Sequence, residues 1–236
     1  MRYKRADIDS LSFSATNLEG IFIGHEDYTI QVVKSKSIFE PKEWKQAFGK
    51  PLSQHIIDAR IVHTHLGLKL PLKTFSSSPH RQTVEFAGLK GYDERSELLV
   101  STLKDLKSRL QQARVTRIDV CLDYEGGIPR KVISSLHKAR EKKNKFRYGC
   151  TKYLKTPSEK KRKLKSNPRL DIKYYNKSLE SGLEGNLMRL EFCFKSPYLG
   201  KVKLIDLEVV LQRIEKTIKR MAGITIKIKP FSDLKV

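Results

Sequence analysis

Side chains able to act on a phosphate ester gather between residues 169 and 195, in RLDIKYYNKSLESGLEGNLMRLEFCFK. The pattern predicts two strands, Leu170–Ser178 and Asn186–Lys195, joined by a glycine-containing turn. Since side chains two apart on a strand share a face, one face would be apolar and the other would surround Tyr175 with acids and bases. That second face comprises Asp171, Lys173, Tyr175, Lys177, Arg189, Glu191, Cys193 and Lys195. A solvated face would tolerate this set at little cost, but we predict a site centred on Tyr175.

A third stretch, Thr116–Tyr124, adds carboxylates. Its alternation places Asp119 and Asp123 on one strand face, and Glu191 supplies a third acid beside Arg189. Carboxylate oxygens are hard ligands that suit Mg²⁺ or Mn²⁺. If these strands are neighbours in a sheet, a tyrosine would lie beside an acidic metal site.

That combination predicts attack by a tyrosine on a DNA phosphodiester. The metal would polarise a phosphate oxygen, and the phenolate of Tyr175 would be the nucleophile. Lys173 and Lys177 would stabilise charge on the phosphate and help the phenol to lose its proton. A covalent phosphotyrosine would keep the bond energy available for rejoining.

Composition supports an anionic partner. The chain has 236 residues, a formal net charge of +22 and 39% hydrophobic residues, enough for a packed core. Such a charge favours nucleic acid. A membrane is not expected, because no apolar run is long enough to span one and no basic amphipathic helix exposes Trp or Phe. No secretory signal is evident, and the three widely spaced cysteines contain no CxxC pair, so we expect a reducing cytoplasm.

Periodicity predicts an α+β fold, with a mostly antiparallel sheet carrying the site on one face and helices packed on the other. The expected helices are Asp93–Arg114, Pro129–Lys142 and Lys201–Ala222. The expected strands outside the central hairpin are Leu11–Thr16, Gly20–Gly24, Tyr28–Ser35, Ile56–Lys69, Gln82–Leu89, Thr116–Tyr124, Phe146–Leu154 and Thr225–Lys229. We expect one domain over 1–236, with a catalytic core at about 80–222 and a β-rich N-terminal part at 1–75.

Two further features invite a role. The loop Thr156–Pro168 is polar and densely cationic; a charge run of this kind is often only solvated, but in this chain we predict DNA contacts. The predicted DNA-binding residues are Lys160, Lys161, Arg162, Lys163, Lys165 and Arg169. His63 and His65 are interpreted as strand-surface residues, with membership of a metal site as the alternative.

The ordered motifs resemble those of the rolling-circle replication initiators of small Gram-positive plasmids, the replication-initiation-factor family, and more loosely those of filamentous phage initiators. They are RIDVCLD at 117–123, IKYYNKSLE at 172–180 and RLEFCFK at 189–195. TVEF at 83–86 also resembles a strand of that family, which makes Glu85 a further candidate. Together the motifs cover roughly half the chain.

The resemblance implies a replication-initiator nuclease-like fold and a role for each residue. Tyr175 would cut the origin and become linked to the 5′ phosphate, leaving a 3′ hydroxyl to prime synthesis. Asp119, Asp123 and Glu191 would bind the metal, with Glu85 and Glu180 as weaker candidates. Because Tyr174 precedes Tyr175, a one-residue shift of register would exchange the two phenols.

The same resemblance implies partners. They are origin DNA, single-stranded or extruded as a hairpin, a second copy of the chain and a host helicase, in a bacterial cell on a plasmid or phage replicon. Two alternatives stay open. One is a non-catalytic basic DNA-binding protein, such as a phage or plasmid repressor or a single-strand binder. The other is a structural or ribosome-associated basic protein.

Overall fold

The structure is a computed structural model. It describes residues 6–16, 28–33, 56–63, 69–75, 78–87, 108, 110–139, 145–148, 151–155 and 169–228. Side chains are described for residues 6–14, 83–86, 108, 110–139 and 169–228. The described strands form one ten-stranded sheet in the order β2-β3-β4-β5-β1-β6-β10-β9-β8-β7, with every neighbouring pair antiparallel. The strands are β1 Ala6–Thr16, β2 Tyr28–Val33, β3 Ile56–His63, β4 Lys69–Phe75, β5 Ser78–Ala87, β6 Arg114–Glu125, β7 Lys145–Tyr148, β8 Thr151–Lys155, β9 Leu170–Asn176 and β10 Leu187–Lys195.

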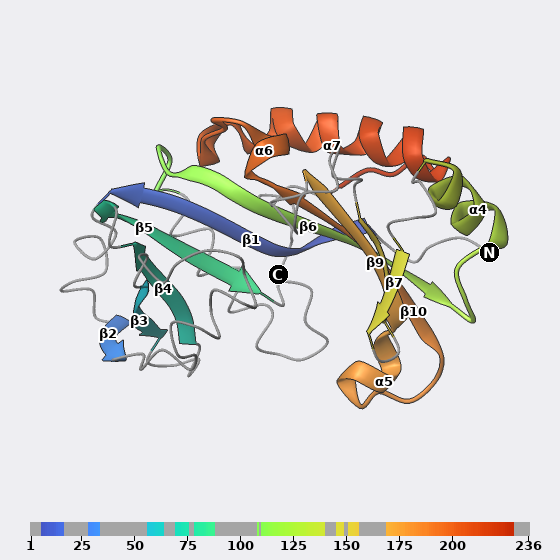
Figure 1. Ribbon diagram of the computed structural model, residues 1–236, viewed down its shortest axis with the longest axis horizontal. Coiled ribbons are helices and arrows are strands. Elements are labelled where there is room, and N and C mark those ends of the chain that lie inside the picture. The colour runs from blue at the N-terminus through green and yellow to red at the C-terminus, as the bar shows by residue number, and fades with distance from the viewer. Residues whose placement is uncertain are drawn as a thin grey trace.

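Helices cover one side of the central strands. The described helices are α4 Arg130–Ala139, α5 Lys177–Ser181, α6 Ser196–Leu199, a 3₁₀ turn η2 Leu204–Asp206, and α7 Leu207–Ala222. In Figure 1, α4, α6 and α7 lie along one side of the sheet, whereas α5 projects from the end where β9 turns into β10. The predicted α+β class, with an antiparallel sheet and helices on one face, is confirmed. None of the described helices is long and apolar enough to cross a membrane.

The core lies between the sheet and α7. The helix buries apolar side chains three or four residues apart, which follows from 3.6 residues per turn. They pack with the apolar residues of β1, β6, β9 and β10 in one cluster. Burial of this kind contributes about 25 cal/mol per Å² of apolar surface. The helices therefore fix the sheet from one side and leave the polar face for a site.

Helix α7 starts later than the sequence predicts. The predicted helix Lys201–Ala222 begins only at Leu207, because the preceding backbone bonds to the start of β6 instead. Val115 N donates to Val202 O (2.9 Å), and Leu204 N donates to Ala113 O (2.9 Å). Residues that make these bonds cannot also make the helical ones.

Several predicted strands have different bounds. The stretch predicted as Ile56–Lys69 contains β3 and the first residue of β4, and Phe146–Leu154 divides between the paired strands β7 and β8. Strand β9 stops at Asn176, because the Asn176 side chain accepts the Leu179 amide (3.1 Å) and caps α5. The predicted strand Thr225–Lys229 is wrong over its described residues 225–228, where the Ile228 amide donates to Glu215 of α7 (2.7 Å).

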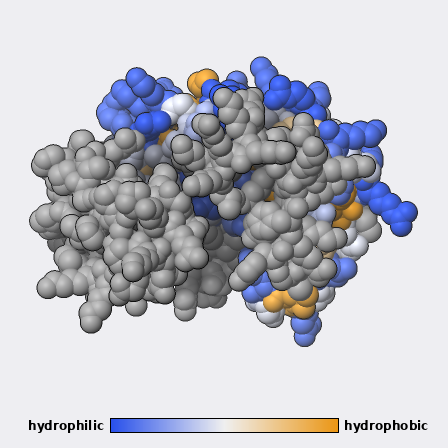
Figure 2. Space-filling view, in the orientation of Figure 1, coloured by the Kyte–Doolittle hydropathy of each residue, from blue (hydrophilic) through white to orange (hydrophobic). Residues whose placement is uncertain are grey.

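Other predictions fall on parts of the chain that are not described. These are the strand Gly20–Gly24, residues 93–107 of the predicted helix Asp93–Arg114, and the cationic loop Thr156–Pro168. At its end the predicted helix is wrong, because residues 110–113 form a turn and Arg114 belongs to β6. Figure 2 shows hydrophilic atoms over most of the described surface, with hydrophobic atoms at the end where α5 lies, where Leu179 and Leu183 are exposed.

Candidate functional site

The pairing of β9, β10 and β6 gathers the predicted residues on one face. Arg189 of β10 lies opposite Tyr175 of β9 and opposite Asp123 of β6. Glu191, the next residue on that face of β10, lies opposite Lys173. The tyrosine strand β9 and the acidic strand β6 are therefore not direct neighbours; both pair with β10, which lies between them.

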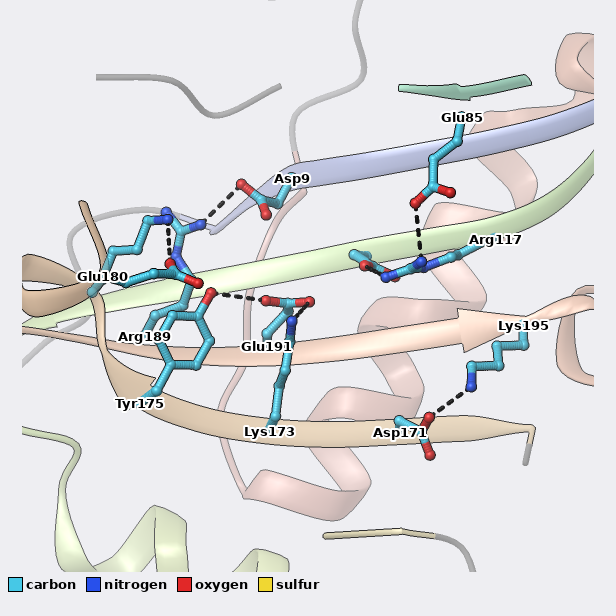
Figure 3. A network of polar contacts seen from close by, with 12 residues as sticks. Asp9, Glu85, Arg117, Asp171, Lys173, Tyr175, Glu180, Arg189, Glu191 and Lys195 are labelled. Atoms are coloured by element: carbon cyan, nitrogen blue, oxygen red, sulfur yellow. Dashed lines mark hydrogen bonds and ion pairs between the residues drawn. The ribbon is translucent and has the colours of Figure 1, made fainter. Parts of the chain in front are cut away.

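The phenol of Tyr175 is held by a carboxylate. Its hydroxyl donates to Glu191 Oε2 at 3.1 Å, and Lys173 Nζ lies 2.8 Å from Glu191 Oε1. Lys173 also lies 5.5 Å from the centre of the Tyr175 ring. Figure 3 shows the three side chains reaching toward one another from adjacent strands. The arrangement is a hydroxyl, an acceptor for its proton and a cation that orients the acceptor.

Burial governs the proton affinities of this pair. Tyr175 is 6% exposed and Glu191 2% exposed. Burial, followed by the charge of Glu191, raises the pKa of Tyr175 above its ordinary range, while Arg189 opposes the rise. Burial also raises the pKa of Glu191, and Lys173 opposes that rise. In the described state the phenol therefore keeps its proton and shares it with Glu191.

Arg189 is fully buried and lies between two carboxylates. Its Nε and Nη2 donate to the two oxygens of Asp123 at 2.9 and 3.1 Å, and its Nη1 donates to Asp9 at 2.9 Å. Burial alone would lower the pKa of the guanidinium, but its hydrogen bonds to Asp123 and the nearby negative charges raise it instead. Two-point bonding of this kind fixes the plane of the guanidinium.

Asp9 was missed in the sequence. It lies in a β-bulge of β1, because Ile8 pairs with Val120 and Ser10 with Asp119, which leaves one extra residue. The signal was present, since the apolar positions change phase by one residue, from Ala6 and Ile8 to Leu11 and Phe13. An alternation that changes phase indicates a bulge, and the bulge turns Asp9 toward Arg189.

The remaining predicted acids pair with other bases. Arg117 binds Asp119 through two nitrogens and Glu85 through a third, at 3.0 Å for Glu85. Lys195 binds Asp171 at 2.7 Å. Lys177 does not continue the strand face, because it begins α5, where it pairs with Glu180.

These carboxylates, as they lie, do not make a metal centre. Each of the four metal candidates bonds to an arginine, a lysine or a tyrosine, and the described residues hold no group of three or more His, Cys, Asp or Glu side chains that could bind a metal ion. The side chain of His63 and the whole of His65 are outside the described residues.

The other predicted residues lie away from this polar cluster or outside the described residues. Tyr174 lies on the helix-covered face, opposite Leu190, and packs against the core. Arg169 is exposed at the start of β9, where its carbonyl accepts the Lys195 amide at 3.1 Å. The five predicted DNA-binding residues between 160 and 165 are outside the described residues.

Comparison with known proteins finds a similarity in structure but none in sequence. No family model matches the sequence, and no curated protein matches it. A rolling circle replication initiator protein from Geobacillus stearothermophilus is similar in structure, with a TM-score of 0.49 and 11% identity over 92% of this chain and 85% of that one. A TM-score below 0.5 at this identity is too low to carry an argument about fold or activity. The fold and the proposed activity therefore rest on the residues of this chain.

Proposed function

We propose that this chain cuts and rejoins single-stranded DNA through a covalent bond to Tyr175, and thereby initiates rolling-circle replication. The observation that carries the proposal is the hydrogen bond from the Tyr175 hydroxyl to Glu191, whose other oxygen is held by Lys173. A nucleophile bonded to a base that a third group orients is the arrangement that nucleophilic catalysis needs.

Each atom of the proposed step has a place. Glu191 takes the phenol proton, and the Tyr175 oxygen bonds to phosphorus. The bond from phosphorus to the 3′ oxygen breaks, so the 5′ phosphate stays on the protein, and the leaving 3′ oxygen takes up a separate proton to become the 3′ hydroxyl. As Glu191 gains its proton it attracts Lys173 less, which frees the ammonium for the charge on the phosphate oxygens.

The choice of DNA as the substrate is supported by charge and by motif order. The net charge of +22 favours a polyanion. The motifs that resemble replication initiators lie on adjacent strands, with the tyrosine strand and both acidic strands side by side. The initiating role, the hairpin form of the origin, a homodimer, a host helicase and a bacterial cytoplasm come from that resemblance alone, and are proposed with it.

Mg²⁺ or Mn²⁺ is a separate proposal. Among the residues whose side chains are described, several carboxylates lie on the polar face, and carboxylate oxygens are the ligands that these cations prefer. They are Asp7, Asp9, Glu85, Asp119, Asp123, Asp171 and Glu191. As they lie, the four metal candidates Asp119, Asp123, Glu191 and Glu85 are bonded to Arg117, Arg189 or Lys173, so we assign no step to a metal.

The test needs no known origin. The protein is incubated with a random pool of single-stranded DNA and Mn²⁺, denatured in SDS and examined for a DNA adduct, with Tyr175→Phe and Tyr174→Phe beside the wild type. We expect an adduct that only Tyr175→Phe abolishes. Loss with Tyr174→Phe alone would move the reaction to the other phenol. The absence of an adduct from every sample would reject the proposal.

A non-catalytic DNA-binding protein is the second candidate. The observation that favours it is the burial of Tyr175, since a nucleophile that is 6% exposed with a raised pKa is not ready to attack. This candidate predicts salt-dependent binding of DNA without an adduct, and Tyr175→Phe would then leave the affinity unchanged.

A further inference from the structure

Strand β1 brings an acid to the site from the side opposite Tyr175. In the sheet, β1, β6, β10 and β9 are consecutive, so the strands β1 and β9 lie about 14 Å apart at about 4.8 Å per strand. By register, Asp9 is level with Val120 and Asp119 of β6, and Tyr175 is level with Asp123. In Figure 3, the Asp9 carboxyl reaches from β1 toward Arg189, and the Tyr175 phenol reaches from β9 toward Glu191. The two side chains therefore approach the middle of the polar face from opposite sides.

Asp9 is the accessible partner of Arg189. Its side chain is 14% exposed, against 3% for Asp123 and 1% for Arg189. It contacts the guanidinium through one oxygen at 2.9 Å, whereas Asp123 uses both of its oxygens. A group that enters beside Arg189 thus meets Asp9 before it meets Asp123.

The surroundings of Asp9 raise the pKa of its carboxyl above the ordinary value. Burial raises the pKa of this carboxyl, and Asp119 raises it further, while Arg189 and Lys177 oppose the rise. The charge of Asp9 in turn raises the pKa of Tyr175 and the pKa of Glu191.

In-line displacement places the attacking and leaving oxygens on opposite sides of phosphorus. With Tyr175 attacking from the β9 side, the leaving 3′ oxygen would point toward β1. An alkoxide leaves poorly unless it gains a proton in the transition state, and a positioned acid contributes about 10²- to 10⁴-fold.

We propose that Asp9 is the general acid that protonates the leaving 3′ oxygen, an inference that rests on the proposed function. The bond from phosphorus to the Tyr175 oxygen forms as the bond to the 3′ oxygen breaks. The phenol proton goes to Glu191, and the Asp9 proton goes to the 3′ oxygen. In rejoining, the Asp9 carboxylate takes that proton back from the 3′ hydroxyl while Glu191 returns its proton to the phenol.

Sulfur in place of the leaving oxygen tests this step. The cleavage site, taken from DNA trapped in the random pool, is made as two oligonucleotides, one with the natural 3′ oxygen and one with a bridging 3′ sulfur. A thiol has a pKa of about 8.5, so its thiolate leaves without a proton. We expect Asp9→Asn to slow adduct formation at least about 100-fold with oxygen and less than about 10-fold with sulfur.

Asp123→Asn is the matched control, because it too removes a carboxylate from Arg189. It is expected to slow both oligonucleotides equally, as a positioning residue should. Should Asp9→Asn not fold, Asp9→Ser, which keeps an acceptor for Arg189 without an acidic proton, is expected to show the sulfur rescue.

Three outcomes would overturn the inference and are distinguishable. Equal slowing of both oligonucleotides by Asp9→Asn, with a normal wild-type adduct, would make Asp9 a positioning residue only; an unchanged rate with oxygen would remove it from the reaction. No adduct from the wild type with either oligonucleotide would reject the proposed function, and the inference with it.

Discussion

The phenol of Tyr175 and the carboxylate of Glu191 share one proton across two neighbouring strands, with 3.1 Å between their oxygens. The pair lies beneath the surface, and Lys173 is its more exposed neighbour. A hydroxyl held in this way keeps its proton while Lys173 holds Glu191 in place.

Glu191→Gln should remove the base. The amide keeps the shape of the side chain but cannot take the phenol proton, so single-turnover adduct formation is expected to fall by about 10²- to 10⁴-fold. Quench-flow with the trapped oligonucleotide measures the rate. Tyr174→Phe, which changes a phenol on the opposite face, is the control and should keep the wild-type rate. A Glu191→Gln rate within a factor of three of the wild type would assign the proton to another acceptor.

The rate should depend on pH through Glu191. Burial raises the pKa of this carboxyl from its ordinary 4.5, and a protonated Glu191 cannot accept. With the 3′-sulfur oligonucleotide, which needs no proton from Asp9, adduct formation is therefore expected to rise with pH through a midpoint above 4.5 and then to level off. The free energy of unfolding has the opposite pH dependence, because the folded state binds the Glu191 proton more tightly than the unfolded state does. The stabilisation that this proton provides is present at acid pH and is lost as pH rises through the raised pKa. Glu191→Gln should remove both dependences.

Arg189→Met should destabilise the protein strongly. It leaves the carboxylates of Asp123 and Asp9 in the sheet without their shared cation, and breaking a buried pair costs about 3–5 kcal/mol. Urea denaturation followed by circular dichroism measures the free energy of unfolding. Lys195→Met, at a partly exposed pair with Asp171, is the control and should cost about 1 kcal/mol or less. Equal losses would contradict the central role of Arg189.

Gly182 ends α5 in the left-handed conformation, with φ of 63°. Its position is open to solvent, so an added methyl group meets no atom, and only the backbone is strained. Gly182→Ala is expected to cost about 1–2 kcal/mol of unfolding free energy. Ser181→Ala, one residue earlier within the helix, serves as the comparison and should change stability by less than about 0.5 kcal/mol. Thermal denaturation of the two variants decides the point.

Metal removal tests the proposal of Mg²⁺ or Mn²⁺. We expect EDTA to abolish the Tyr175 adduct and Mn²⁺ to restore it. Asp119→Asn should weaken Mn²⁺ binding, measured by titration calorimetry without DNA. An adduct of equal yield in EDTA would show that the lysine and arginine side chains suffice, and the metal proposal would then be dropped.

Much of the site could be predicted from alternation along the strands. The polar face around Tyr175 and the neighbouring acidic strand follow from a period of two, which the sheet preserves over Arg189, Glu191 and Asp123. Alternation places a side chain on a face, but it does not say how far a long side chain reaches. The sequence therefore suggested free carboxylates for a metal, where the structure pairs each with a cation.

Asp9 and the start of α7 show what local patterns miss. A bulge changes the phase of alternation along β1, so a rule that assumes strict alternation does not place Asp9 beside Arg189. The backbone bonds between residues 113–115 and 202–204 join segments far apart in sequence, and they override a helical pattern. Both are long-range effects, which a window of a few residues does not contain.

The position of β1 has a consequence for how the chain folds. Asp9 and Arg189 are 180 residues apart in sequence, yet β1 lies between β5 and β6 in the middle of the sheet. During synthesis, β1 is made before the other described strands, and its neighbours β5 and β6 follow about sixty and about a hundred residues later. Contacts of such high order slow folding and leave a strand edge exposed to other chains. Assembly of the polar face is thus a late event that requires the chain from β1 to β10.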